Sequence, residues 1–272
     1  MLTIDAAGLT DVGQKRDGNE DAFLVDGERR LYVVADGMGG HLAGEVASAL
    51  VVDTFKESPL TAGTEQPQRF DETLSSEANR VLECIHAANR SVHEKSTADE
   101  QCRGMGATVS AVYCTNSTLI IANVGDSPIY LVRDGHVEQL SVPHTVAAEQ
   151  AAIDPDRLAL IGDKIKHMLT RAIGVSESVV PDVCEMPGFN NDVLIICSDG
   201  LSNLVNPEEI ADISSQHEPP EACKKLVDLA NERGGDDNIT VIVIKLNKKP
   251  SRLQSTLLFF LKYSGLDKLI NH

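Results

Sequence analysis

The stretch VVADGMGGHLAG, residues 33–44, gives the first indication of the fold and the chemistry of this chain. An apolar run ends at Asp36, and four glycines lie within the eight residues that follow. An Asp-Gly pair usually forms the turn of a β-hairpin. Here the next segment, AGEVASALVV, has the pattern of a helix and not that of a second strand. Asp36 therefore needs an explanation other than a hairpin turn.

Three further aspartates flank apolar runs in a related way. Asp199 ends VLIICSD, Asp237 stands just before NITVIVIKL, and Asp126 follows STLIIANV. If the last strand runs antiparallel to the others, these aspartates and Asp36 meet at one edge of a sheet. Clustered carboxylates repel one another unless cations lie between them, and sites made only of oxygen atoms suit Mg²⁺ or Mn²⁺. We therefore expect a divalent metal site.

The segment QKRDGNEDAF, residues 14–23, adds Arg16, Glu20 and Asp21 to the candidates. Taken alone, it reads as an exposed charged loop. Beside a site of several aspartates, its carboxylates become further ligand candidates. The planar guanidinium of Arg16 then suits a phosphate group.

Composition and charge exclude several classes of protein. A net charge of −17 makes nucleic acid a poor partner, whereas divalent cations suit an acidic chain. No apolar stretch approaches the ~20 residues that span a bilayer, and the N-terminus lacks a basic segment followed by an apolar run. The six cysteines are scattered without a C-x-x-C pair. These features predict a cytoplasmic protein without a thiolate zinc site.

The pattern of elements indicates an α+β fold. Short β-branched runs dominate, and the Asp-Gly pairs at 26–27 and 134–135 separate strand-like runs as hairpin turns do. Helical periodicity is clear over residues 69–93, and residues 43–55 and 219–232 also read as helices. Antiparallel strands with inserted helices favour layers over a βαβ repeat.

Two further expectations concern the surface. His86 and His93 fall on the polar face of the helix predicted over 69–93, so we assign them to solvent and not to a ligand site. Residues 141–168 have weak, mixed patterning, which predicts a mobile surface segment.

Seven segments, in this order, resemble the motifs of the metal-dependent protein phosphatases of type 2C, especially the bacterial members. They are RDGNED, VVADGMGGHLAGEVAS, GATVSAVY, NVGDSPIYLVRDG, HMLTRAIG, VLIICSDGLSNLV and GGDDNITVIVI. The resemblance covers about residues 5–246. It implies a four-layer α/β/β/α sandwich of two antiparallel sheets flanked by helices, with a catalytic domain over 1–246. It also implies hydrolysis of phosphoserine and phosphothreonine in proteins, opposing a bacterial Ser/Thr kinase.

The resemblance implies two metal ions, Mn²⁺ or Mg²⁺, which share a water or hydroxide that attacks the phosphate. Asp36 would bridge the two ions, and Asp199 and Asp237 would hold one of them. The carbonyl of Gly37 would serve the other ion, together with Glu20 or Asp21, acting directly or through water.

Two further roles follow from the resemblance. Asp126, with Asp199, would hold a third and weaker ion. Arg16 would bind the phosphate of the substrate.

The chain departs from the family pattern at two places. Animal members carry a histidine two residues after the first metal aspartate, where this chain has Met38, so the leaving group needs another proton donor. His41, three residues further on, is a weak candidate. Many bacterial relatives carry Asp-His at the start of the flap, residues 141–168, which helps to select the substrate. Here His144 is present and the aspartate is absent.

The segment 247–272 lies beyond the resemblance. It carries five Lys or Arg residues against a single Asp, and Leu253, Leu257, Phe260 and Leu261 form an apolar stripe. Such a basic amphipathic tail either packs back on the domain or docks to a partner or an acidic membrane surface.

Three functional readings remain open. The first is a Ser/Thr protein phosphatase, acting as a monomer on phosphoproteins that are a kinase or its targets. The second is a phosphatase of a small phosphorylated molecule, with the same site and a different flap. The third is a binding module without catalysis, and the presence of Asp36, Asp199 and Asp237 argues against it.

Overall fold

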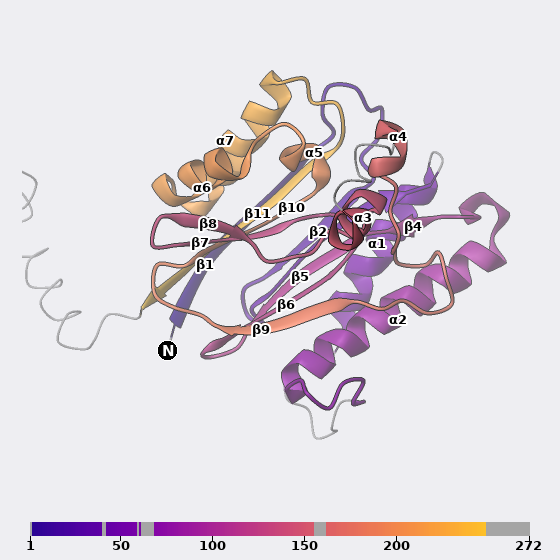
Figure 1. The fold of residues 1–272 in the computed structure, drawn as a ribbon, viewed down its shortest axis with the longest axis horizontal. Coiled ribbons are helices and arrows are strands. Elements are labelled where there is room, and N and C mark those ends of the chain that lie inside the picture. The colour runs from indigo at the N-terminus through magenta and orange to yellow at the C-terminus, as the bar shows by residue number, and fades with distance from the viewer. Residues whose placement is uncertain (1, 40–41, 59, 61–67, 155–161, 249–272) are drawn as a thin grey trace, which may run out of the picture.

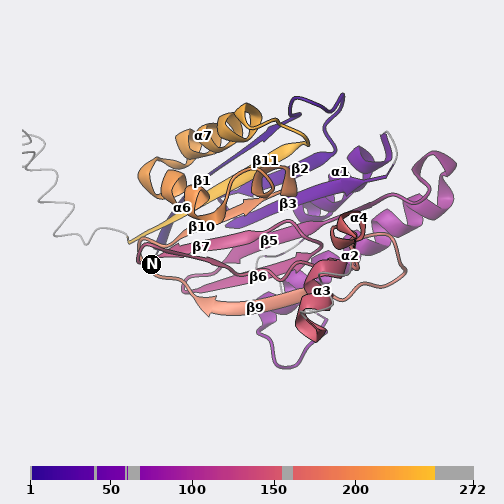
Figure 2. The same ribbon diagram turned by 45° about the horizontal axis from the view of Figure 1, so that its top comes forward.

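The computed structural model describes residues 2–39, 42–58, 60, 68–154 and 162–248. In these residues two antiparallel sheets pack face to face, and helices cover both outer faces (Figures 1 and 2). The predicted α/β/β/α sandwich is therefore confirmed. None of the described helices combines the length and the apolar character needed to cross a membrane.

The first sheet has the strand order β1-β11-β10-β7-β8. Its strands are β1 (Leu2–Asp11), β7 (Ile129–Arg133), β8 (His136–Gln139), β10 (Val193–Cys197) and β11 (Ile239–Lys248). Strand β11 pairs with β1 along its whole length, ending with Lys248 opposite Leu2. Strand β11 thus continues to Lys248, two residues beyond position 246.

The second sheet has the strand order β2-β3-β5-β6-β9, and a short strand, β4, also pairs with β3. Its strands are β2 (Asp21–Asp26), β3 (Leu31–Met38), β4 (Gly106–Ala107), β5 (Val109–Cys114), β6 (Thr118–Val124) and β9 (Asp182–Pro187). The Asp-Gly pairs at 26–27 and 134–135 lie between β2 and β3 and between β7 and β8, so both predicted hairpins are confirmed.

Helices cover the two outer faces. The helices are α1 (Leu42–Glu57), α2 (Ser76–Ala98), η1 (Glu100–Cys102), α3 (Val146–Ile153), α4 (Asp163–Lys166), α5 (Asp199–Ser202), α6 (Pro207–Gln216) and α7 (Pro219–Glu232). Helices α1 and α2 pack on the second sheet, and α6 and α7 pack on the first (Figure 2).

Strand β10 shows why apolar runs dominate the sequence. Leu194 and Ile196 point into the core between the sheets, whereas Val193, Ile195 and Cys197 point into the core beneath α6 and α7. Because a strand alternates its side chains between two faces, a strand buried on both faces must be apolar throughout.

Helix α2 begins later than the periodicity over 69–93 predicts. Ser75 caps its first turn by accepting a hydrogen bond from the amide of Ala78, at 3.1 Å. The side-chain oxygen of Asn79 accepts from the amides of Phe70 and Asp71, which folds the preceding residues back on the helix. These side-chain bonds compete with helical bonds, so the helix begins only at Ser76.

His86 and His93, which were predicted on a solvated helix face, are half-buried and make contacts there. The ring of His86 packs on Phe70 with centroids 4.4 Å apart. Nδ1 of His93 donates a hydrogen bond to the carbonyl of Gly174, at 3.0 Å. Both imidazoles are used in packing between segments, and neither reaches the aspartates described next.

Candidate metal centre and phosphate site

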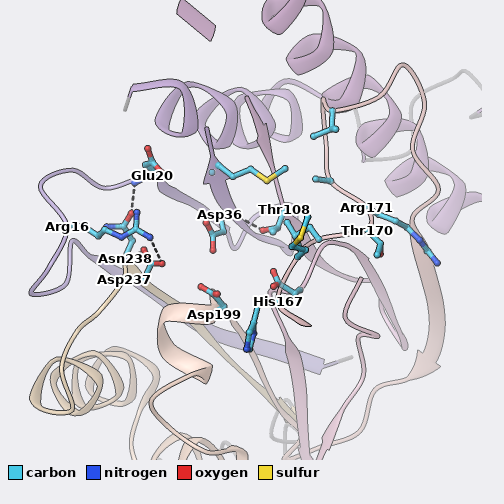
Figure 3. A pocket seen from close by; sticks show the side chains of 17 residues that line it. Arg16, Glu20, Asp36, Thr108, His167, Thr170, Arg171, Asp199, Asp237 and Asn238 are labelled. Carbon is cyan, nitrogen blue, oxygen red and sulfur yellow. Dashed lines mark hydrogen bonds and ion pairs between the residues drawn. The ribbon is translucent and has the colours of Figure 1, made fainter. Parts of the chain in front are cut away.

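One cavity of about 520 Å³ is lined by Asp36, Asp126, Asp199, Asp237 and Arg16 (Figure 3). The aspartates do not lie at one edge of a single sheet, as the sequence predicts, but come from two sheets. Asp36 belongs to the second sheet, whereas Asp199 and Asp237 flank strands of the first. The site lies where the two packed sheets open at one end, so its carboxylates come from both layers.

Asp36 lies inside β3, which runs on to Met38, and not at the end of the strand as predicted. Thr108 holds its backbone in place. The amide of Asp36 donates to Oγ1 of Thr108 at 3.0 Å, and the amide of Thr108 donates to the carbonyl of Asp36 at 2.8 Å. Oγ1 of Thr108 also lies 2.8 Å from Oγ of Ser127, which ties Asp36 to the loop that carries Asp126.

Asp199 is the first residue of α5, as the helix-like segment after it indicated. Its carboxylate accepts a hydrogen bond from Nδ2 of Asn203, at 3.2 Å. The next residue has to be glycine, because a Cβ at Gly200 would lie 2.0 Å from the carbonyl oxygen of Asn238. This close contact sets Asp199 beside Asp237 at the start of β11.

Asn238 organises the loop that carries Arg16. Its Nδ2 donates to the carbonyls of Val12 and Gly18, both at 2.9 Å, and its Oδ1 accepts from the amide of Glu20 at 2.8 Å. The guanidinium of Arg16 then reaches Asp237, with Nη2 and Oδ2 2.7 Å apart. Arg16 therefore stands at the cavity with its side chain about half exposed.

Gly37 fits the predicted role of a carbonyl ligand, since it lines the cavity and allows close backbone packing. A Cβ at this position would lie 2.1 Å from the carbonyl oxygen of Gly44 and 2.6 Å from that of Glu20. Any larger residue would push α1 and the loop before β2 away from the site.

Glu20 lines the cavity, whereas Asp21 is buried beside it. The carboxylate of Glu20 lies against the first turn of α1, within 3.0 Å of where a Cβ at Gly44 would be, and points away from Asp36 (Figure 3). Asp21 pairs with Asp36 across β2 and β3 but is buried and does not line the cavity. One of its oxygens accepts a hydrogen bond from Oγ of Ser198 at 2.7 Å.

Burial and mutual repulsion raise the pKa of the carboxyl groups at the site. Burial raises the pKa of Asp126 to about 6, with a further contribution from the charge of Asp199. Burial raises the pKa of Asp36 well above its ordinary value, and the charges of Asp21 and Asp199 add to this. The pKa of Asp199 is also raised, by burial and by the charge of Asp237.

The donor set fits hard divalent cations. Among the described residues, no three carboxylate, imidazole or thiol groups form a ready-made metal cage. The aspartates instead surround a cavity that is large enough for ions, their water ligands and a phosphate group. Cations placed between the carboxylates would relieve the repulsion that raises their pKa values.

A further wall of the cavity comes from the segment His167–Arg171, to which the sequence motif HMLTRAIG gave no role (Figure 3). This segment includes the end of the flap and is hydrogen-bonded to the start of the flap. The amide of Val146 donates to the carbonyl of Met168, and the amide of Thr170 donates to the carbonyl of His144. Met38 lines the cavity, whereas His41 lies outside the described residues.

His144 has a carboxylate partner although the aspartate expected before it is absent. Its Nδ1 accepts from the amide of Gly125 at 3.1 Å, and its Nε2 lies 3.1 Å from Oδ2 of Asp182 on β9. Arg171 donates to the other oxygen of Asp182, at 2.9 Å. The start of the flap is therefore fixed to the loop that carries Asp126.

The fold and the site define a phosphohydrolase that binds divalent metal ions through carboxylates, and comparisons with known proteins agree. The profile of the family described as protein phosphatase 2C matches residues 14–239. The serine/threonine phosphatase stp of Listeria welshimeri is 33% identical over 247 residues, which cover 88% of this chain and 94% of that protein.

Two solved structures are similar in fold. The serine/threonine phosphatase PstP/Ppp of Mycobacterium tuberculosis has a TM-score of 0.77 and 30% identity, covering 91% of this chain and 100% of that one. The catalytic domain of PstP in complex with two manganese ions has a TM-score of 0.78, 30% identity and the same coverage. This chain therefore belongs to the protein phosphatase 2C family, and it is a metal-dependent serine/threonine phosphatase.

Proposed function

We propose that the chain removes phosphate from serine and threonine side chains of phosphoproteins at this cavity, and that it opposes a bacterial Ser/Thr kinase. The observation that carries this proposal is the convergence of four aspartates and Arg16, from distant parts of the chain, on one cavity. The family and the relatives support the same chemistry.

Asp36, Asp199, Asp237 and the carbonyl of Gly37 are the groups that we assign to two Mn²⁺ or Mg²⁺ ions. Asp126, with Asp199, is assigned to a third. Such ions lower the pKa of a water molecule that they share and stabilise the charge that develops on the phosphoryl oxygens. Glu20, which lines the cavity, or Asp21, which is buried beside it, is assigned to the ion at Gly37, directly or through water.

Arg16 orients the phosphate in this proposal. One nitrogen of its guanidinium is held by Asp237, which fixes the plane of the group and leaves other N–H donors available to phosphate oxygens. Met38 has no proton to give to the leaving group. Among the described residues that line the cavity, His167 is the imidazole, so it is the first side chain to test as a proton donor.

The test is hydrolysis of a phosphothreonine peptide and of p-nitrophenyl phosphate, each with Mn²⁺, with Mg²⁺ and with EDTA. Metal-dependent release of phosphate from both substrates is the expected result. Release from p-nitrophenyl phosphate and small metabolite phosphates, but not from any peptide, would favour the small-molecule reading. No release from a folded, metal-loaded chain would favour the binding-module reading.

The remaining assignments of the proposal concern the whole protein. We assign the chain to the cytoplasm and to a monomeric state, with 249–272 as a basic tail beyond the folded domain. The support for the tail as a docking segment is its charge pattern and apolar stripe, which suit an acidic partner or membrane surface.

A further inference from the structure

A second cavity, of about 380 Å³, adjoins the catalytic one. It is lined by His93, Arg103, Gly104 and Val175, among others, and Val175 lines both cavities. Gly106 packs between a residue of the catalytic cavity and this shared residue: a Cβ at Gly106 would lie 2.7 Å from Cε of Met38 and 2.9 Å from Cγ2 of Val175. A peptide whose phosphorylated residue occupies the catalytic cavity can therefore extend over Val175 into the second one.

Arg103 lies at this second cavity, with its backbone held by hydrogen bonds and its side chain exposed. Its amide donates to the carbonyl of Glu100, and the amide of Gly104 donates to Oγ of Ser96 at 3.0 Å. Its side chain is 74% exposed, and its ion pair with Glu100 is long, at 4.0 Å. An exposed pair of this kind is weak, so the guanidinium is available to another anion.

The distance between Arg103 and the catalytic cavity determines how many residues separate such an anionic side chain from the phosphorylated residue of a substrate. Arg103 is three residues before Gly106, which pairs with Met38 at the catalytic cavity. Three residues of chain span at most about 11 Å. An extended peptide covers this distance in about three residues, before the reach of the two side chains is added.

The opposite side of the catalytic cavity has the other sign of charge. A further hollow there shares Arg16 and Glu20 with the catalytic cavity and carries Asp17 and Glu45. Strand β3 lies between β2, which begins just after Glu20, and β4, which begins three residues after Arg103. Because acidic residues repel anions, an anionic substrate side chain is favoured at Arg103 and disfavoured at Glu45.

We propose that Arg103 binds an anionic side chain of the phosphopeptide substrate, about two to four residues from the phosphorylated residue and on one side of it only. This inference rests on the proposed function. Arg103 then selects among substrates and takes no part in the chemistry. Glutamate, aspartate and a second phosphorylated residue share the chemistry that it recognises.

The test uses the full-length chain with Mn²⁺ and phosphothreonine peptides of equal length. Each peptide carries one Glu, Gln, Lys or phosphoserine at the second, third or fourth residue before or after the phosphothreonine. We expect Glu to raise kcat/KM about threefold to fivefold over Gln on one side only. Phosphoserine gives a larger gain if a second phosphate is the natural ligand, and no more than Glu if it is a carboxylate.

Arg103→Ala should reduce the Glu-to-Gln ratio to about one, and Arg103→Glu should make Lys the preferred residue. Hydrolysis of p-nitrophenyl phosphate should stay unchanged in both variants, because this substrate does not reach the second cavity. Arg69→Glu is the matched control. This control makes the same Arg-to-Glu change at an exposed residue that precedes the N-terminus of α2, whereas Arg103 follows its C-terminus. Helix α2 has 23 residues and is ~34 Å long.

A Glu-to-Gln ratio of one in the unaltered chain, or an Arg103→Glu variant with the unaltered preference, would overturn the proposal. A chain that hydrolyses p-nitrophenyl phosphate but no phosphopeptide would instead overturn the proposed phosphoprotein function, and the inference with it.

Discussion

At the scale of single residues, the groups that position the site are less visible in the sequence than the groups that form it. Asp36, Asp199 and Asp237 stand out because each one interrupts or borders an apolar strand. Thr108 and Asn238 do not stand out, because their partners lie far away along the chain: Thr108 bonds Asp36, 72 residues away, and Asn238 bonds Glu20, 218 residues away. No local pattern encodes such a pair.

Arg16 should act on substrate capture more than on turnover. In Arg16→Ala the aspartates remain, but the donor assigned to the phosphate oxygens is lost. We expect KM for p-nitrophenyl phosphate to rise about tenfold, the value of one charge-assisted hydrogen bond, with a smaller change in kcat. Steady-state kinetics at saturating Mn²⁺ measures both. An unchanged KM would argue against the assignment, and Arg69→Ala serves as the control for a lost surface charge.

The raised pKa values predict how the metal-free chain responds to pH. Burial raises the pKa of Asp126 and of Asp21 to about 6, above the value of about 3.9 in an unfolded chain. The folded chain then binds more protons than the unfolded chain between these two values, so the free energy of unfolding falls as the pH rises from about 4 through 6.

Thermal unfolding in EDTA measures this effect. We expect Tm to fall by at least about 3 °C from pH 4.5 to pH 6.5, and Asp126→Asn to reduce the fall. Saturating Mn²⁺ should reduce it too, because the ions bind the deprotonated, folded site. A Tm that rises over this range in EDTA would show that other groups govern the stability.

At the scale of elements, the strand and helix types follow from the sequence, and their limits depend on tertiary bonds. The periodicity over 69–93 locates α2, but the side chains of Ser75 and Asn79 determine where the helix begins. The pairing of strands into two sheets is equally hidden. Each apolar run is compatible with either sheet, so the sequence does not show which strands pair. The aspartates are predicted at one edge of a single sheet, whereas they converge from both sheets.

His144, near the start of the flap, allows a test of how the flap is attached to the loop that carries Asp126. Because Nδ1 of His144 accepts from Gly125, its Nε2 carries the proton and donates to Asp182. Burial lowers the pKa of His144, which favours this neutral form. His144→Ala leaves the Gly125 amide and the Asp182 carboxylate without this partner.

We expect His144→Ala to lower the free energy of unfolding by about 2–3 kcal/mol and to raise KM for a phosphothreonine peptide. Chemical denaturation and peptide kinetics measure the two effects. His136→Ala, at an exposed residue of β8, is the matched control and should change neither. A His144→Ala variant as stable as the control would show that the imidazole does not hold the flap.

At the scale of the whole molecule, β11 is the last described element, and its pairing with β1 reaches Lys248. Removal of residues 249–272 should therefore leave Tm and the turnover of p-nitrophenyl phosphate unchanged. Cutting two residues earlier removes the pairs of Asn247 with Thr3 and of Lys248 with Leu2, which gives a control of slightly lower Tm. A collapse of activity on removal of 249–272 would mean that the tail is part of the catalytic domain.

The central claim for the molecule is that its converging aspartates hold the metal ions of a phosphatase. The most direct measurement is the number of Mn²⁺ ions bound per chain, by equilibrium dialysis with metal analysis, for the unaltered chain, Asp36→Asn and Asp134→Asn. We predict at least two ions for the unaltered chain and for Asp134→Asn, whose change lies in the turn between β7 and β8. We predict fewer ions for Asp36→Asn, with hydrolysis of p-nitrophenyl phosphate reduced at least about a hundredfold. Equal numbers of bound ions in all three proteins, with Asp36→Asn fully active, would contradict the account.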